Sequence, residues 1–353
     1  MGGIVELPFG LATSVGVLPV GATGEALTSA GAIDLALATQ PAFPSVPSSG
    51  GVDRSMLAQA VVGLEGVQVL PPGLLRLPEG AEEAEVVHDG PVRAEGEPFG
   101  LLDEFLARLP EHRREHGDDV LGVRVGVLGP VSLALALRAA GVDVERAVEL
   151  SASIVPARAT AVLERVRAGA GDGVVAVVMH EPGLIGAMHP TFPLAPSQVL
   201  SLLTPVVTGL DEAAGEHPLL IGAHVPGRTD WETIICSGVS LVSAPADAGL
   251  LGWAEPLAGF FDAGGRIAWG AVPVDQPLGT GEELLWRRLS ALWCQLVGEG
   301  LDPLQLRSHS LTSPVDGLGH FGVSQAVRAL ALVDSLSLRV RRQAIGARLS
   351  LGA

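Results

Sequence analysis

The sequence predicts an α/β protein whose 353 residues form a single (β/α)8 barrel of the TIM type. Short apolar segments with the character of buried strands alternate with longer amphipathic segments, which indicates a parallel sheet covered by helices on both faces. About eight such units fit the length of the chain. A doubly wound open sheet is the main alternative, but no GxGxxG motif opens a helix, so a Rossmann dinucleotide site lacks support.

The N-terminal part of the predicted barrel is its least regular region. We expect an opening strand within residues 11–20 that ends near Gly16, followed by a helix over Glu25–Ala38. The segment PAFPSVPSSGG then predicts a long loop, and Arg54–Gly63 predicts a short helix. Residues 64–97 are rich in Gly, Pro and Glu and alternate without a helical period. We interpret them as a hairpin or loop excursion from the barrel.

From residue 99 onward, strand-like and helix-like segments alternate regularly. The predicted strands are Val120–Leu128, Gly173–Met179, Leu219–Ala223, Val239–Val242, Arg266–Val272 and Leu304–Arg307. The predicted helices are Phe99–Leu109, Val131–Ala140, Asp143–Ala168, Ser197–Ala214, Asp230–Cys236, Leu250–Asp262, Glu282–Val297 and Val323–Leu349. In such barrels the catalytic residues lie at the carboxyl ends of the strands, so the residues that follow each strand are the first candidates for a site.

The net charge and the hydropathy of the chain limit which partners and which cellular compartment we expect. The net charge of −17 argues against nucleic acid and anionic membranes, both of which require a basic surface. We find no uninterrupted apolar run of about 18 residues and no basic, apolar leader at the N-terminus. We therefore expect a cytoplasmic protein without membrane spans, and the composition predicts no particular oligomeric state.

The residue types that are absent restrict the chemistry further. The chain has no lysine, asparagine or tyrosine, and all 22 basic residues are arginine. Without lysine, a Schiff base, a pyridoxal phosphate anchor and a Walker-type phosphate loop are excluded. The two cysteines, Cys236 and Cys294, are not spaced as a CxxC pair, and we expect both to be reduced and buried.

Polar residues and glycines follow several predicted strands. If these strands lie side by side, their carboxyl ends bring together Gly16, Gly129, His180, Glu181, His224, Asp275, His309 and Asp316. His180 and Glu181 follow a fully apolar strand, so the carboxylate is a candidate for binding a substrate amine and the imidazole for transferring protons. The alternative is an ordinary polar start of a loop.

Two further histidines are candidates for the same mouth of the barrel. His224 ends its strand and is a candidate acid–base group or metal ligand, the alternative being a histidine that is merely hydrogen-bonded. His320 lies in the glycine-rich segment SPVDGLGHFG before the last long helix. The backbone amides of such a loop suit an anion, whereas a tight turn that requires glycine explains the segment equally well.

Four stretches of the chain resemble motifs of the cobalamin-independent methionine synthase family, specifically its C-terminal catalytic barrel. They occur in the family's order and are Thr13–Pro19 (TSVGVLP), Val127–Leu135 (VLGPVSLAL), Val177–Leu184 (VVMHEPGL) and Ser313–Leu318 (SPVDGL). The wider superfamily includes uroporphyrinogen decarboxylase and corrinoid methyltransferases. The resemblance implies a barrel that binds a small-molecule substrate in its mouth. The site residues that we expect there are His180, Glu181, His224 and His320 for catalysis, and Val15, Gly16, Glu181 and Asp316 for substrate binding.

The residues that would hold the family's zinc are mostly replaced. Members of the family hold zinc with a His-x-Cys pair, a glutamate and a late cysteine, and the metal keeps the acceptor thiol deprotonated. Here His224 matches the histidine, but Pro226 stands at the cysteine position and Asp316 at that of the late cysteine, while Ser240–Ala246 (SLVSAPA) carries no carboxylate. His180 and Val17 also depart from the family's motifs. We therefore expect no thiolate zinc site, and His224 and Asp316 remain as weak metal candidates.

Three functions stay open at the level of the sequence. The first is methyl transfer to a small thiol or a related acceptor by a divergent methionine-synthase-like enzyme. The second is a cofactor-free lyase that resembles uroporphyrinogen decarboxylase, in which arginines would hold substrate carboxylates and His320 would serve as the acid. The third is a non-catalytic barrel that binds a small molecule.

Overall fold

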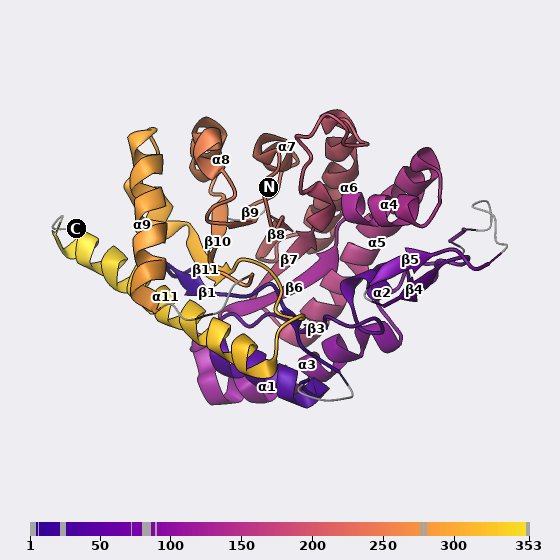
Figure 1. Ribbon diagram of the computed structural model, residues 1–353. Coiled ribbons are helices and arrows are strands. Elements are labelled where there is room, and N and C mark those ends of the chain that lie inside the picture. The colour runs from indigo at the N-terminus through magenta and orange to yellow at the C-terminus, as the bar shows by residue number, and fades with distance from the viewer. Residues whose placement is uncertain are drawn as a thin grey trace.

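The fold is built on a curled sheet of seven parallel strands (Figure 1). The computed structural model describes residues 5, 7–21, 26–71, 73–79, 86–88, 90–275, 278 and 281–350, without the side chains of 344–350. Across the sheet the strands are ordered β1 (Leu11–Ala12), β11 (Ser310–Pro314), β10 (Arg266–Val272), β9 (Leu241–Pro245), β8 (Leu219–His224), β7 (Val174–His180) and β6 (Gly122–Leu128). Because every pairing is parallel, the carboxyl ends of these strands meet at one edge of the curled sheet.

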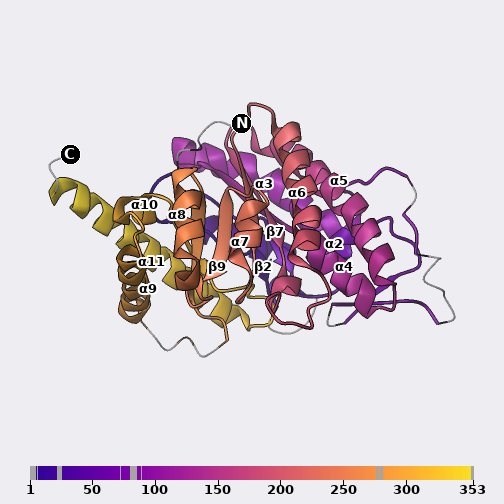
Figure 2. The same cartoon turned by 90° about the horizontal axis from the view of Figure 1, so that it is seen from above.

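Helices follow most of the strands and cover the outer face of the sheet (Figure 2). The α-helices are α1 (Ser29–Thr39), α2 (Met56–Ala60), α3 (Gly100–His116), α4 (Pro130–Ala139), α5 (Val144–Ala170), α6 (Pro196–Ala214), α7 (Trp231–Cys236), α8 (Ala254–Asp262), α9 (Glu282–Gly298), α10 (Pro303–Ser308) and α11 (Val323–Ser350). Short 3-10 helices are η2 (Glu97–Phe99), η3 (Gly117–Asp119), η4 (Pro182–Leu184) and η5 (Leu250–Trp253). No helix in the described part of the chain is both long and apolar enough to cross a membrane.

The two faces of the sheet are buried against different partners. In β7, Val175, Val177 and Met179 belong to the large core that the sheet shares with the helices. The alternating residues Ala176 and Val178 belong instead to a second cluster on the concave side. Its buried members are Leu7, Leu11, Phe43, Ala176, Val178, Leu220, Leu241, Ala268 and Leu311. Since side chains alternate along a strand, the inward row of β7 continues from Val178 to His180.

The proline-rich segment that the sequence predicted as a loop lies between the two edges of the sheet. On one side the amide of Arg124 in β6 donates to Pro44 O (2.9 Å), and the amide of Val46 donates to Arg124 O (2.7 Å). On the other side β3 (Ser48–Ser49) pairs in parallel with β2 (Val17–Leu18). Three prolines in PAFPSVPSSGG lack an N–H group, so this segment cannot form a continuous ladder. Closure by a regular eighth strand stays a prediction.

One predicted strand is a helix in the structure, and one predicted hairpin is present. The predicted strand Leu304–Arg307 is wrong, because these residues form α10, whose Asp302 cap accepts from Leu304 N at 2.7 Å and whose first residue is a proline. The true strand is the serine- and threonine-rich β11. By contrast, the predicted hairpin within 64–97 is present as the antiparallel pair β4 (Gln68–Leu70) and β5 (Leu74–Arg76).

The prediction that both cysteines are buried is also wrong. Cys236 ends α7 with an exposed side chain, and Cys294 is exposed on α9. The buried face of α9 is formed by Leu285, Leu289, Trp293 and Leu296. Cys294 follows Trp293 directly and is therefore rotated by about 100° away from that face.

Candidate functional site

Two histidines and a serine lie side by side at the carboxyl ends of β7, β8 and β9. In the sheet register His180 is opposite His224, and His224 is opposite Ser243. All three side chains are buried, and the rings of His180 and His224 have their centroids 5.1 Å apart at an interplanar angle of 54°. The register thus brings His180 and His224 together at the carboxyl ends of neighbouring strands, as expected, and their catalytic roles stay predictions.

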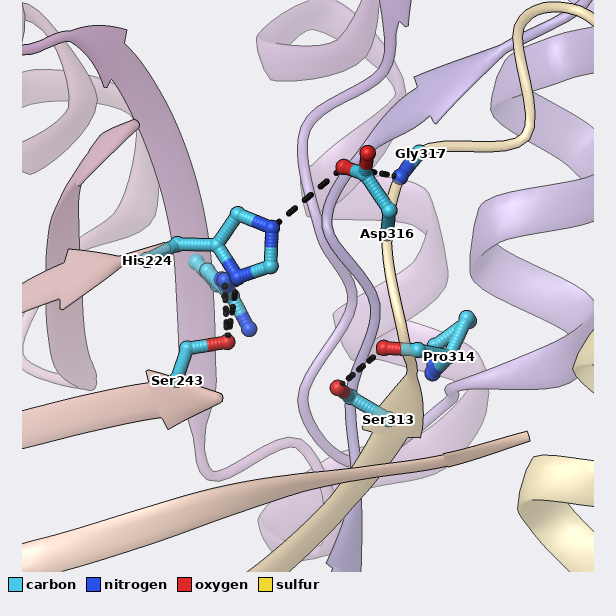
Figure 3. Close-up of polar contacts among 7 residues, drawn as sticks. His224, Ser243, Ser313, Pro314, Asp316 and Gly317 are labelled. Carbon is cyan, nitrogen blue, oxygen red and sulfur yellow. Dashed lines mark hydrogen bonds and ion pairs between the residues drawn. The ribbon is translucent and has the colours of Figure 1, made fainter. Parts of the chain in front are cut away.

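His224 is held on both sides of its ring (Figure 3). Its Nδ1 lies 2.9 Å from Ser243 Oγ, and its Nε2 lies 3.4 Å from Asp316 Oδ1. Asp316 follows β11 by two residues, and its Oδ1 also accepts a hydrogen bond of 2.7 Å from the amide of Gly317. A half-exposed carboxylate thus links the buried imidazole to the solvent at the carboxyl ends of the strands.

The charges of these groups at neutral pH follow from their surroundings. Burial lowers the pKa of His224 below its ordinary value, although the contact with Asp316 works in the opposite direction. For Asp316, burial works to raise the pKa, but the contacts with His224, the Gly317 amide and the charge of His320 outweigh it, so that its pKa is lowered. The site therefore combines an ionised Asp316 with a neutral His224, which is the form of histidine that can accept a proton.

His180 is the more deeply desolvated member of the histidine pair. Burial, followed by the effects of His224 and Arg124, holds its pKa well below the ordinary value. Its Nε2 has no hydrogen-bond partner among the residues that the structure describes. The ring lies over Gly126 of β6, since a Cβ at Gly126 would be only 2.7 Å from His180 Nε2.

Arg124 is a site residue that the sequence reasoning missed. It lies on β6 with only 1% of its surface exposed, and its Nη2 donates a long hydrogen bond of 3.5 Å to Ser243 Oγ. Burial lowers its pKa to about 9, so the guanidinium keeps its charge at neutral pH. The sequence does contain a hint of this role: Arg124 is the one charged residue in the otherwise apolar strand segment GVRVGVL. Because side chains alternate along a strand, it lies on the same face as Gly126 and Leu128. Ser243 was likewise overlooked, because only the lack of a carboxylate in its strand was considered.

Glu181 is buried against the N-terminus of α4. Its Oε1 accepts from the amide of Val131 (3.0 Å), while its Oε2 accepts from the amide and the hydroxyl of Ser132 (2.7 and 2.6 Å). Burial raises the pKa of Glu181 to about 7, even though these hydrogen bonds favour the charged form. In the structure this carboxylate caps the N-terminus of α4 by accepting hydrogen bonds from its first amides. Substrate binding by Glu181 stays a prediction.

The remaining predicted site residues are dispersed. Val15 is buried, and Gly16 has a φ of 89° and approaches the segment 45–46 so closely that a Cβ would lie 2.8 Å from Val46 O. His320 is exposed and acts on Asp316 through its charge, and Asp275 is exposed beyond the end of β10. The predicted place of His309 at the carboxyl ends of the strands is wrong. His309 directly precedes β11 and therefore lies at the amino ends, because the strand was predicted six residues too early in the sequence.

The donor set at the mouth does not fit the zinc of the methionine synthase family. Within the described ranges, no group of three or more His, Cys, Asp and Glu side chains is arranged to hold a metal ion. Pro226 has no donor atom, β9 contributes the hydroxyl of Ser243 instead of a carboxylate, and both cysteines lie on outer helices. His224 and Asp316 bind each other, and no chemical step is therefore assigned to a metal.

Comparison with known proteins supports the fold and leaves the activity open. No protein-family model matches the chain, and no curated protein matches it. A solved structure from Listeria monocytogenes, of a protein provisionally assigned as a vitamin-B12-independent methionine synthase, is similar with a TM-score of 0.56 and 12% sequence identity. The match covers 96% of this chain and 98% of that chain. At this identity the likeness shows a TIM-barrel-like fold with a curled parallel sheet.

Proposed function

We propose that this protein is a methionine-synthase-like enzyme that transfers a methyl group to a small thiol or a related acceptor, without being an authentic zinc-dependent methionine synthase. The observation that carries the proposal is the placement of His224, buried and neutral between Ser243 and Asp316 at the end of β8. The carboxyl ends of the strands are where barrels of this type bind their substrates. Four sequence motifs in the family's order and a similar fold over nearly the whole chain add support.

In the proposed reaction His224 replaces the metal as the group that activates the acceptor. Because the Nε2 of the neutral ring carries the N–H that faces the Asp316 carboxylate, the lone pair of His224 lies on Nδ1, next to the hydroxyl of Ser243. The acceptor's S–H proton passes through the Ser243 hydroxyl to Nδ1 while the sulfur attacks the methyl carbon of a methylated folate, the donor class that the family resemblance implies. A C–S bond forms, the N–CH3 bond breaks, and the departing nitrogen receives the proton from His224. Asp316 stabilises the transient imidazolium, and general base catalysis of this kind contributes about 10²- to 10⁴-fold.

The proposal is tested by methyl transfer with chelator-treated protein. We expect slow transfer from methyltetrahydrofolate to small thiols that resists chelators and that His224→Gln abolishes. His217→Gln is the matched control, because His217 is exposed and lies just before the amino end of β8. Robust turnover that needs added zinc would contradict the proposed mechanism, and so would transfer that survives in His224→Gln.

A lyase is the second candidate, and it rests on Arg124. A buried guanidinium in the barrel is the kind of group that holds the carboxylate of a substrate. The predicted acid of this reaction, His320, is exposed beside Asp316 at the mouth. Release of CO2 from a small carboxylic acid, lost in Arg124→Gln and in His320→Gln, would favour the lyase over methyl transfer. Ligand binding without either reaction would indicate a non-catalytic binding protein.

A further inference from the structure

A buried positive charge lies below the histidine pair without a negative partner. The Nε and Nη1 groups of Arg124 have no hydrogen-bond partner in the described part of the chain, and its Nη2 makes only the 3.5 Å contact to Ser243. None of the ion pairs formed by the described residues includes Arg124. Leaving a charged group buried and unpaired is costly, commonly by several kcal/mol.

The nearby carboxylates are already engaged elsewhere. Glu181 is bound by the amides and the hydroxyl at the start of α4, and Asp316 is bound by His224 and Gly317. Nε2 of His180 is another buried polar atom without a hydrogen-bond partner in the described part of the chain. The pKa of this ring is lowered first by burial, then by His224 and by the charge of Arg124, so the two groups lie within electrostatic reach of each other. Among the residues that the structure describes, this region therefore contains several N–H donors, while both carboxylates discussed here are already hydrogen-bonded.

The other buried arginine with a lowered pKa, Arg158, provides a useful contrast. Arg158 lies on α5, and its Nη1 and Nη2 donate to the carbonyl oxygens of Arg93 and Val62. These bonds attach the turn after α2 and the end of the excursion to α5. Arg124 has no such carbonyl partners, so its surroundings are not those of an arginine that simply fastens two segments together.

We propose that Arg124 forms an anion subsite at the floor of the barrel mouth, where it binds the carboxylate of a small monoanionic ligand together with the Nε2 of His180. With both histidines neutral, the subsite carries one positive charge, which one carboxylate balances. A phosphate dianion would leave a negative charge uncompensated and would be repelled by Asp316. Guanidinium and carboxylate form strong charge-assisted hydrogen bonds. The subsite deepens the proposed function by naming the chemical class of its substrate, but it rests on its own geometry.

Anion-dependent thermal stability tests the subsite without any methyl donor. Sodium acetate, sodium phosphate and sodium chloride are titrated at constant ionic strength into the wild type, Arg124→Gln and Arg158→Gln. We expect acetate to raise the Tm of the wild type with a saturating concentration dependence. The apparent Kd should rise roughly tenfold or more in Arg124→Gln and stay unchanged in Arg158→Gln, which controls for the loss of a buried arginine.

Several outcomes would overturn the subsite. These are an equal effect of acetate on wild type and Arg124→Gln, no saturating effect of acetate on the wild type, or a saturating effect of phosphate that exceeds that of acetate and is lost in Arg124→Gln. Saturation and the dependence on Arg124 are required because phosphate also stabilises folded proteins non-specifically. If Arg124→Gln does not fold, a crystal of the wild type grown with bromide gives an independent answer. An anomalous peak within hydrogen-bond distance of Arg124 supports the subsite, and a water in that place overturns it. Acetate binding in a protein without methyl transfer would uphold the subsite and reject the proposed function.

Discussion

Gly129 and Glu181 approach each other so closely that no side chain fits at position 129. A Cβ at Gly129 would lie 2.6 Å from Cγ of Glu181 and closer still to its carboxyl group. The carboxylate in turn is fixed by the amides of Val131 and Ser132. Gly129 precedes α4 and Glu181 follows β7, so this contact fixes the start of the helix against the end of the neighbouring strand. Glu181 is the residue next to His180 in the sequence, so the contact also lies next to the histidine pair.

The first prediction follows from this contact. Gly129→Ala should destabilise the protein by about 1 to 3 kcal/mol, because the new methyl group must displace a buried, hydrogen-bonded carboxylate. Urea unfolding measures the effect. Gly259→Ala on α8 is the control, since a Cβ there would have no atom within 4 Å and alanine favours a helix. Equal stability of the two variants would show that Glu181 is free to move.

The second prediction concerns the pH dependence of stability. The pKa of Glu181 is about 7 in the folded protein against an ordinary value of 4.5, so this group contributes stability at low pH that is lost as the pH rises from 4.5 to 7. The slope from this one group is at most about 1.4 kcal/mol per pH unit. Glu181→Gln should remove it.

The two buried histidines change the stability with pH in the direction opposite to Glu181, so the contribution of Glu181 has to be measured apart from theirs. His180 and His224 have lowered pKa values, so their contribution is lost as the pH falls below 6.5. The informative quantity is therefore the difference in unfolding free energy between the wild type and Glu181→Gln, measured in urea from pH 4.5 to 8. A difference that does not change with pH would reject the prediction.

The third prediction tests the pairing of His224 with Asp316. Asp316 raises the pKa of His224 against the larger effect of burial, so Asp316→Asn should lower that pKa further. NMR titration of the histidine Cε1–H signals measures it, and the His224 signal is assigned by its loss in His224→Gln. The exposed His217 serves as the internal control. A His224 signal that titrates at the same pH in both proteins would mean that the 3.4 Å contact is not maintained in solution.

The fourth prediction concerns the glycine beneath His180. A Cβ at Gly126 would lie 2.5 Å from Met56 Cε and 2.7 Å from His180 Nε2. Because a methionine end group moves easily, Gly126→Ala should cost only about 1 kcal/mol in urea unfolding but should tilt His180 and weaken acetate binding. Adding Met56→Ala should restore part of that binding. Unchanged acetate binding in Gly126→Ala would exclude His180 from the subsite.

The long, periodic elements were predictable and the irregular ones were not. Strands such as β6 and β7 and helices such as α5 and α6 follow from uninterrupted apolar or amphipathic patterns. β11 was missed because its sequence SLTSP is polar, whereas the more apolar LQLR before it carries a helix cap and an N-terminal proline. All residues of β11 are buried by the neighbouring strands and helices, and this burial depends on the tertiary structure, so the polarity of the local sequence does not reveal it.

The same reasoning explains the success and failure at the site. His180 and His224 were found because each ends an apolar strand, and the sheet register then brings them together. Arg124 was missed because it lies within a strand, where only the curl of the sheet reveals that its face is the inner one. Glu181 was placed at the right strand end, but its direction depends on α4, which a rule about strand ends does not describe.

The pairing of β1 with β11 has a consequence for biosynthesis. Leu11 is the register partner of Leu311, so β1 leaves the ribosome about 300 residues before the strand with which it pairs. Contacts of such long sequence separation form slowly. Until then the edges of the nascent sheet are open to pairing with other chains, and we expect translation to be the stage at which this protein is most prone to aggregate. A two-residue β1 presents few free hydrogen-bonding groups during that interval, which limits the exposure.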